Sequence, residues 1–110
     1  TDVDPWTNKY IFPGGVLPVA EQIDEASAGS FIMEDWHNFG ADYDPTLMAW
    51  MANVDAHREA LRELGYDDHF YRMWRYFLLS SAGSARARRN QLWQIVYSKQ
   101  GLDGGYVSIR

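Results

Sequence analysis

Two long stretches of helical periodicity constrain the fold of this chain more than any other feature. Residues 46–64 and 67–83 repeat apolar side chains at three- and four-residue steps, the spacing of one buried helix face. Asp44 and Pro45 precede the first stretch as a capping residue followed by proline, and Gly65 ends it. The sequence therefore predicts two successive amphipathic helices, interrupted only at Arg58, whose apolar faces carry Leu47, Trp50, Met51, Val54, Leu61 and Leu64, then Phe70, Met73, Trp74, Phe77, Leu78 and Ser81.

The remaining segments predict a small mixed fold around these helices. Residues 18–27 predict a short helix, residues 31–36 and 91–98 predict strands, and residues 1–15 predict a loop. Two strands alone make a marginal sheet, and its exposed edges recruit partners. The predicted class is therefore α/β, and we expect the strands to join a larger sheet or to pair with another copy of the chain.

The composition is that of a folded protein. Of 110 residues, 46% are hydrophobic and 15% aromatic, which is enough for the core of one small domain. The net charge of −5 indicates that the chain as a whole is not a general binder of nucleic acid or of anionic membranes. The absence of cysteine excludes disulfides, thiolate metal sites and a cysteine nucleophile within these residues. No apolar run reaches membrane-spanning length, and the first residues do not resemble a signal peptide. Because the chain opens without methionine in a loop-like stretch, we expect a piece of a longer or processed protein.

Polar side chains concentrate in residues 31–50, FIMEDWHNFGADYDPTLMAW. One histidine and several carboxylates are metal-ligand types, but their spacing fits no standard pattern, and Glu34 and Asp35 would point to opposite faces of a strand. The simpler interpretation is a solvated loop in which Asp44 caps the following helix. Tyr43 lies at the end of this loop, where its hydroxyl is either a packing or capping group or a hydrogen-bond donor to an anion.

Other candidate sites are weaker. No serine, histidine and acid form a catalytic arrangement, and Gly14 and Gly15 lack the preceding strand and following lysine of a phosphate loop. His57 and His69 are expected to be solvated helix residues. Five arginines within or just after the second helix either complement its dipole or contact a lipid phosphate or anionic membrane surface: Arg72, Arg75, Arg86, Arg88 and Arg89.

Four segments carry a resemblance to a known family: KYIFPGGVLP (9–18), MEDWHNFGADYDPTLMAW (33–50), LGYDDHFYRMWRYFLLSSAG (64–83) and RARRNQLWQIVYSK (86–99). In this order, and with nearly no gaps, they resemble the C-terminal part of cyclopropane-fatty-acyl-phospholipid synthases. The mycolic-acid cyclopropane synthases share the pattern more loosely. The stretch MEDWHNFGADYD separates this family from generic methyltransferases, and the resemblance runs over residues 8–99.

The resemblance implies that residues 1–110 are a single partial domain. This domain would be the C-terminal portion of a Rossmann-like, S-adenosylmethionine-dependent methyltransferase, with two antiparallel strands and three helices. The implied enzyme adds a methylene across the cis double bond of a membrane phospholipid acyl chain, by methyl transfer and then proton loss to a bound bicarbonate. It would be cytoplasmic and peripheral at the inner membrane. The implied loop for S-adenosylmethionine lies upstream, so we expect this segment to be inactive without its upstream methyltransferase partner.

The same resemblance implies roles for individual residues. Tyr43 is similar to the family's tyrosine that hydrogen-bonds bicarbonate, whose other ligands (a cysteine, a glutamate, a histidine and a backbone group) lie upstream. The chain departs from the family pattern at Ala85, where phenylalanine is usual, and at Asn90, where an apolar residue is usual. No residue here is implied to bind S-adenosylmethionine or metal. The candidates for lining the acyl pocket and its mouth are Phe12, Gly14, Phe39, Trp50 and Trp74.

A second function stays open at the level of sequence. The predicted strand edge is also compatible with a non-catalytic module that binds lipid or self-associates into a homo-oligomer. What lies upstream would separate the alternatives, since a glycine-rich strand–loop–helix is expected only for the methyltransferase.

Overall fold

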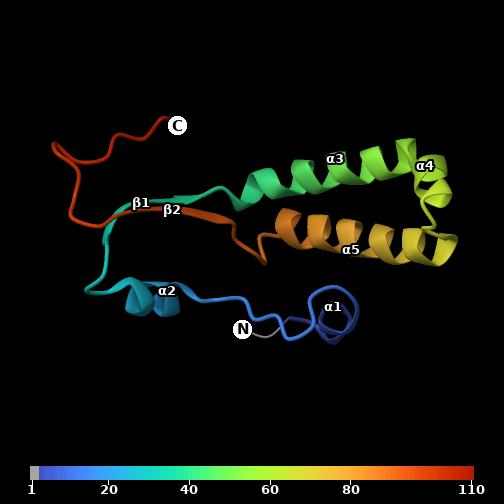
Figure 1. The fold of residues 1–110 in the computed structure, drawn as a ribbon, viewed down its shortest axis with the longest axis horizontal. Helices are drawn as coiled ribbons and strands as arrows, with labels where there is room; N and C mark the ends of the chain where they lie inside the picture. Colours follow the sequence, from blue (N-terminus) through green and yellow to red (C-terminus); the bar gives the residue numbers. More distant parts are fainter. Residues whose placement is uncertain (1–2) are drawn as a thin grey trace. The chain divides into compact units, whose positions relative to one another are not determined.

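The structure is a computed structural model that describes residues 3–110. The chain divides into two compact units: unit 1 comprises Thr1–Trp36 and Ile95–Arg110, and unit 2 comprises His37–Gln94. The elements are α1 (Pro5–Tyr10), α2 (Ala20–Ser27), β1 (Ile32–Asn38), the 3-10 helix η1 (Gly40–Asp42), α3 (Tyr43–Ala56), α4 (Arg58–Glu63), α5 (Asp68–Arg86) and β2 (Trp93–Ser98) (Figure 1).

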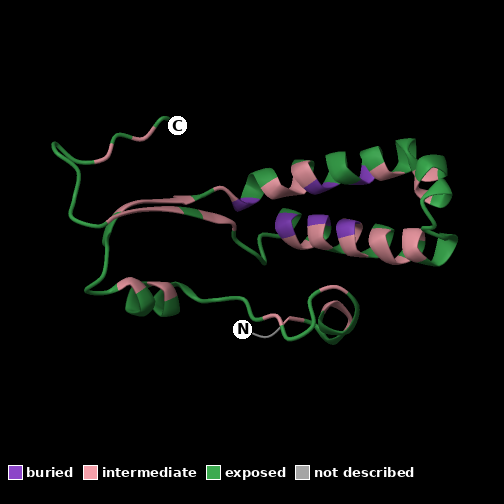
Figure 2. Ribbon diagram, viewed as in Figure 1, coloured by how far each residue is buried: buried purple, intermediate pink, exposed green. Residues whose placement is uncertain are grey.

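Unit 2 is built on a helical hairpin. Helices α3 and α5 run side by side in opposite directions (Figure 1). Leu47 and Met51 of α3 pack with Leu78 and Ala82 of α5 in a buried cluster, and Figure 2 shows the buried positions of α5 on its side toward α3. Burial of side chains such as leucine contributes ~1.5–3 kcal/mol each, so this cluster is the main source of the unit's stability. The two amphipathic helices predicted from sequence are confirmed.

The bounds of the hairpin helices differ from the prediction. The predicted helix 46–64 is two helices, because the backbone of His57 (φ −113°, ψ 22°) separates α3 from α4. Helix α5 is capped by the Asp67 side chain, which accepts a hydrogen bond from the backbone N–H of Phe70 at 2.9 Å, and it continues through Gly83 to Arg86. Two residues of the first predicted stripe lie outside the core, since Trp50 is 46% and Leu64 is 75% exposed.

The prediction that residues 1–15 form a loop was wrong. Pro5–Tyr10 form helix α1, whose N-cap Asp4 accepts a hydrogen bond from the Thr7 backbone N–H at 3.0 Å. Aspartate followed by proline is a helix-start signal, because the side chain satisfies a free N–H and proline needs no donor at the first position. The predicted short helix is confirmed as α2, two residues shorter at its start.

The two strands form one antiparallel pair. The Phe39 N–H donates to the Leu92 carbonyl at 2.9 Å, and the Ser98 hydroxyl donates to a Glu34 carboxylate oxygen at 2.6 Å. As residue numbers rise along one strand, the numbers of the paired residues fall along the other, which is the antiparallel pattern. Within residues 3–110 the sheet has only these two strands, so each strand keeps one unpaired edge.

Unit 1 differs from unit 2 in having no buried side chain within residues 3–36 and 95–110. Large apolar side chains such as Val16 and Phe31 are 59% and 52% exposed. Exposed apolar side chains gathered together are typical of interaction sites. Unit 1 therefore presents apolar surface of the kind that packs against further protein. Across residues 3–110, no helix is both long enough and apolar enough to cross a bilayer.

Candidate functional site

Tyr43 is the first residue of α3, directly after η1, rather than part of the preceding loop. Its half-buried ring packs against the buried cluster of the hairpin and meets Trp50 edge-on, with ring centroids 6.0 Å apart and planes at 87°. The Tyr43 hydroxyl finds no hydrogen-bond acceptor within residues 3–110. The ring is therefore fixed by packing while its hydroxyl remains able to donate.

Gly40 fixes the turn that leads into Tyr43. Gly40 is buried, and a Cβ at this position would lie 3.1 Å from both Gln91 Cα and the Leu92 nitrogen. The Gly40 N–H donates to the Asn38 side-chain oxygen at 3.2 Å. The backbone leading into β2 therefore touches the turn so closely that only glycine fits without displacement. Gly40 was not singled out from the sequence, although an isolated glycine beside a strand is itself a signal for close backbone approach.

Asp44 does not cap α3, and that prediction was wrong. Helix α3 begins at Tyr43, so the N-cap position is Asp42, and no side-chain hydrogen bond caps the helix there. Asp44 instead pairs with Arg86 near the end of α5, accepting from its Nε at 2.8 Å and from Nη2 at 3.1 Å. This two-bond contact lowers the pKa of Asp44 and raises the pKa of Arg86, because each charge stabilises the other. Arg86 thus connects the end of α5 to the start of α3, and its charge also complements the α5 dipole.

The polar side chains of β1 have structural partners. Glu34 accepts from Ser98, and Asp35 forms an ion pair with Arg110, so the two neighbouring acids have different partners, as alternation along a strand requires. The imidazole of His37 packs on the Phe39 ring, with centroids 4.9 Å apart. Among residues 3–110, no three histidine or carboxylate side chains come together as a metal-binding group.

Three of the predicted aromatic site residues lie on the helices of the hairpin, and two of them are in contact. Trp74 packs against the same buried cluster as Tyr43, and Trp50 contacts Tyr43 directly. Trp74 also stands in an aromatic row along α5, with Phe70 stacked at 6.1 Å and Phe77 at 5.3 Å. Tyr43 and Trp50 are therefore in direct contact, whereas Trp74 contacts Phe70 and Phe77 on α5.

The other candidates lie elsewhere. Phe39 precedes η1 in unit 2 and is half-buried. Phe12 and Gly14 follow α1 in unit 1, where Phe12 is 56% exposed and the Gly14 N–H donates to the Asn8 side chain at 2.8 Å. Gly14 has φ of +74°, which only glycine adopts readily, so this turn depends on it. The grouping of Phe12 and Gly14 with Tyr43 stays a prediction.

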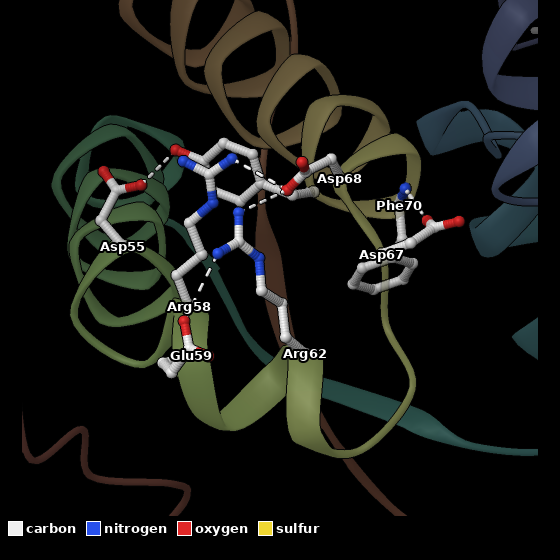
Figure 3. A network of polar contacts seen from close by, with 8 residues as sticks. Asp55, Arg58, Glu59, Arg62, Asp67, Asp68 and Phe70 are labelled. Carbon is white, nitrogen blue, oxygen red and sulfur yellow. Dashed lines mark hydrogen bonds and ion pairs between the residues drawn. The ribbon is translucent and has the colours of Figure 1, made fainter.

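A polar network closes the far end of the hairpin, and sequence reasoning missed it (Figure 3). Arg58 and Arg62 both reach the Asp68 carboxylate, at 3.2 Å and 2.9 Å. The Arg58 guanidinium also lies 3.9 Å from the centre of the Tyr71 ring, whose hydroxyl donates to Asp55. These contacts lower the pKa of Asp68, through Arg62 first and then Arg58. Arg58, which interrupts the predicted apolar stripe, therefore ties α4 to α5.

At Ala85 and Asn90, the positions that depart from the family pattern, the chain is well accommodated. Ala85 is 1% exposed, so the neighbouring side chains close around the smaller residue. Asn90 is exposed, where a polar side chain carries no burial cost.

Comparison with known proteins identifies the family. Residues 1–95 match the family model described as mycolic acid cyclopropane synthetase. The chain is 52% identical over 104 residues to the cyclopropane-fatty-acyl-phospholipid synthase of Escherichia coli K12, covering 94% of this chain and 27% of that protein. It is 49% identical over 85 residues to the Citrobacter freundii protein of the same name, covering 76% of this chain and 91% of that protein. The chain belongs to the mycolic acid cyclopropane synthetase family.

A more distant relative widens the comparison. The tuberculostearic acid methyltransferase of Mycobacterium tuberculosis is 31% identical over 98 residues, covering 87% of this chain and 23% of that protein. The chain spans about a quarter of the length of this relative and of the E. coli relative. The resemblance to cyclopropane-fatty-acyl-phospholipid synthases is confirmed.

Proposed function

We propose that residues 1–110 are the C-terminal portion of a Rossmann-like, S-adenosylmethionine-dependent methyltransferase domain that forms cyclopropane rings on phospholipid acyl chains. The observation that carries this proposal is the 52% identity to the E. coli cyclopropane-fatty-acyl-phospholipid synthase across 94% of the chain. In this proposal a methylene is added to the cis double bond of the acyl chain. The complete enzyme works in the cytoplasm at the surface of the inner membrane.

In this proposal Tyr43 hydrogen-bonds a bicarbonate ion. When bound, bicarbonate supplies the base that takes the proton released after methyl transfer. The observations that support the role are the free donor capacity of the hydroxyl, the ring held by Trp50, and the place of Tyr43 at the start of α3. A helix N-terminus favours an anion, and Arg86 neutralises the carboxylate of Asp44, the residue after Tyr43.

The aromatic surface of the hairpin is proposed as one wall of the acyl pocket. Trp50 contributes apolar area next to the Tyr43 ring, Trp74 contributes it elsewhere along the hairpin core, and Phe39 precedes the turn that leads into Tyr43. Phe12 and Gly14 are proposed to lie at the pocket mouth. An apolar lining with one oriented hydroxyl suits a lipid chain that must be held beside a polar reacting group.

The methyl donor does not fit the residues present in this chain. Gly14 and Gly15 follow the helix α1 rather than a strand, so they do not form the strand–loop–helix that cradles such a cofactor. S-adenosylmethionine, which supplies the methyl group, is therefore assigned to the upstream segment. We expect the 110-residue chain to make no product by itself.

The full-length protein with Tyr43→Phe tests the proposal. The change removes one hydroxyl and keeps the ring contact with Trp50, so we expect kcat to fall about 10²–10³-fold, as for the loss of one preorganised donor. The measurement is cyclopropane product formed from unsaturated phospholipid vesicles and S-adenosylmethionine. Tyr66→Phe is the matched control, since Tyr66 is exposed and stacks on Phe70 away from Tyr43, and should keep wild-type rates. If Tyr43→Phe keeps wild-type turnover, Tyr43 does not belong to the site. If the 110-residue chain alone forms product, the expectation that it needs an upstream segment is wrong.

A further inference from the structure

Charge is unevenly distributed along the chain. The net charge is −5, yet no acidic side chain occurs between Asp68 and Asp103. The basic side chains in this interval are Arg72, Arg75, Arg86, Arg88, Arg89 and Lys99. Such an asymmetry in an otherwise acidic chain indicates an anionic partner for the basic part.

Two arginines of α5 differ from the other arginines of the hairpin in their pairing. Arg58 and Arg62 are held by Asp68, and Arg86 is held by Asp44. Arg72 and Arg75 are exposed, and neither forms an ion pair within residues 3–110. Their charge is therefore available to a ligand from outside the chain.

These two arginines lie together on one face of α5. With three neighbours they line an open depression of about 550 Å³, and the five residues, which we call the α5 basic face, are Arg72, Arg75, Tyr76, Leu79 and Ser80. The spacing of three and four residues places them on a common face, which borders the core through Leu79, a half-buried side chain that also packs against the buried cluster. Leu79 adds apolar surface beside the two guanidinium groups.

We propose that the α5 basic face docks the protein on an anionic phospholipid bilayer, with Arg72 and Arg75 binding lipid phosphates. Guanidinium binds phosphate through two parallel hydrogen bonds, and each basic side chain near an anionic bilayer strengthens binding. Leu79 lines the same depression one turn along α5 from Arg75, as in surfaces that place apolar groups beside charged ones at the headgroups. This inference rests on the proposed function, because a protein that modifies acyl chains must reach the bilayer that contains them.

Vesicle sedimentation of the full-length protein tests the docking surface. The Arg72→Gln/Arg75→Gln variant should bind phosphatidylglycerol vesicles about 30-fold more weakly, equivalent to ~2 kcal/mol at ~1 kcal/mol per basic side chain. The matched control is Lys9→Gln/Lys99→Gln, which removes the same charge from outside the face. If docking uses the α5 basic face, these lysines do not bind lipid phosphate, and the control should change binding less than about threefold. The proposal would be overturned if Arg72→Gln/Arg75→Gln bound these vesicles as tightly as wild type. It would also be overturned if the control variant lost as much affinity as Arg72→Gln/Arg75→Gln. Binding of wild-type protein to neutral phosphatidylcholine vesicles as strong as to anionic ones would also overturn it.

Turnover separates this inference from the proposed function. On phosphatidylglycerol vesicles the Arg72→Gln/Arg75→Gln variant should show a raised KM, whereas on detergent-dispersed unsaturated phospholipid its kcat should match wild type. A loss of kcat on dispersed lipid would place the arginines in the catalytic site and contradict a docking role. If the wild-type protein makes no cyclopropane product on either lipid form, the proposed function fails, while sedimentation still decides whether the α5 basic face binds the bilayer.

Discussion

Gly40 is the residue whose replacement tests the turn before Tyr43 most directly. A methyl group there would meet the backbone of Gln91 and Leu92 at 3.1 Å, and backbone cannot move aside as a flexible side chain does. We expect Gly40→Ala to lower the free energy of unfolding by ~1–3 kcal/mol, the usual cost of overpacking. Urea unfolding followed by circular dichroism measures this change.

Gly83→Ala is the matched control for Gly40. Gly83 lies inside α5, and a Cβ there would meet nothing within 4 Å. Alanine in a helix interior is favoured over glycine, so this variant should gain ~0.5–1 kcal/mol. If both variants shift stability in the same direction, the close approach at Gly40 is not what constrains that position.

At the scale of single residues, the sequence marked the polar stretch around Tyr43 but did not predict the contacts that its side chains make. The polar stretch around Tyr43 was found because acids, aromatics and a proline cluster there. The role of Asp44 was misread because its partner, Arg86, lies far away in sequence. Gly40 was not singled out for the same reason, since its neighbours at Gln91 and Leu92 become neighbours only when the strands pair.

Among the elements, the contact between α3 and α5 should dominate stability. Leu78 is 0% exposed at the centre of the buried cluster, so Leu78→Ala leaves a cavity and should cost ~2–5 kcal/mol. Leu64→Ala removes the same atoms from a side chain that is 75% exposed and should change stability by less than ~0.5 kcal/mol. Urea midpoints of the two variants give the comparison, and equal losses would contradict the hairpin core.

The ion pair that joins the start of α3 to the end of α5 should make stability depend on pH. The Arg86 hydrogen bonds hold the pKa of Asp44 below its ordinary value of 3.8. A lowered folded pKa means that the pair stabilises the protein above the unfolded pKa, and that this stability is lost as pH falls through the folded pKa. Asp44→Asn should therefore unfold at lower urea than wild type near neutral pH, and the difference should shrink below pH 3.8. A constant difference across that range would exclude the ion pair as its cause.

Sequence periodicity predicted the elements that pack against each other, and it failed where local signals compete. The hairpin helices were predicted because burial of one face imposes a regular apolar spacing. The break at His57 was not, since it goes with the contacts of Arg58 to Tyr71 and Asp68, which periodicity does not encode. Helix α1 was missed because an aspartate–proline pair is common both to turns and to helix starts.

For the whole molecule, the two units should differ in local stability. All residues of the buried core described for residues 3–110 belong to unit 2, and unit 1 has none. Local opening is easiest where few apolar contacts are buried. We expect amide hydrogens of α2 to exchange at least ~100-fold faster than those of α5 in the 110-residue chain, measured by hydrogen exchange with mass spectrometry. Uniform protection across both units would show that unit 1 is stabilised by contacts other than core burial.

The contact at Gly40 also has a consequence for building hybrids between related proteins. The turn at Gly40 touches the backbone of Gln91 and Leu92, and Asp44 binds Arg86, so residues 40–44 and residues 86–92 depend on each other structurally. A crossover that takes these two stretches from different parents would combine surfaces that were never fitted to each other. Recombination points should therefore fall before Gly40 or after Leu92, and chimeras that respect this rule should fold more often than those divided between them.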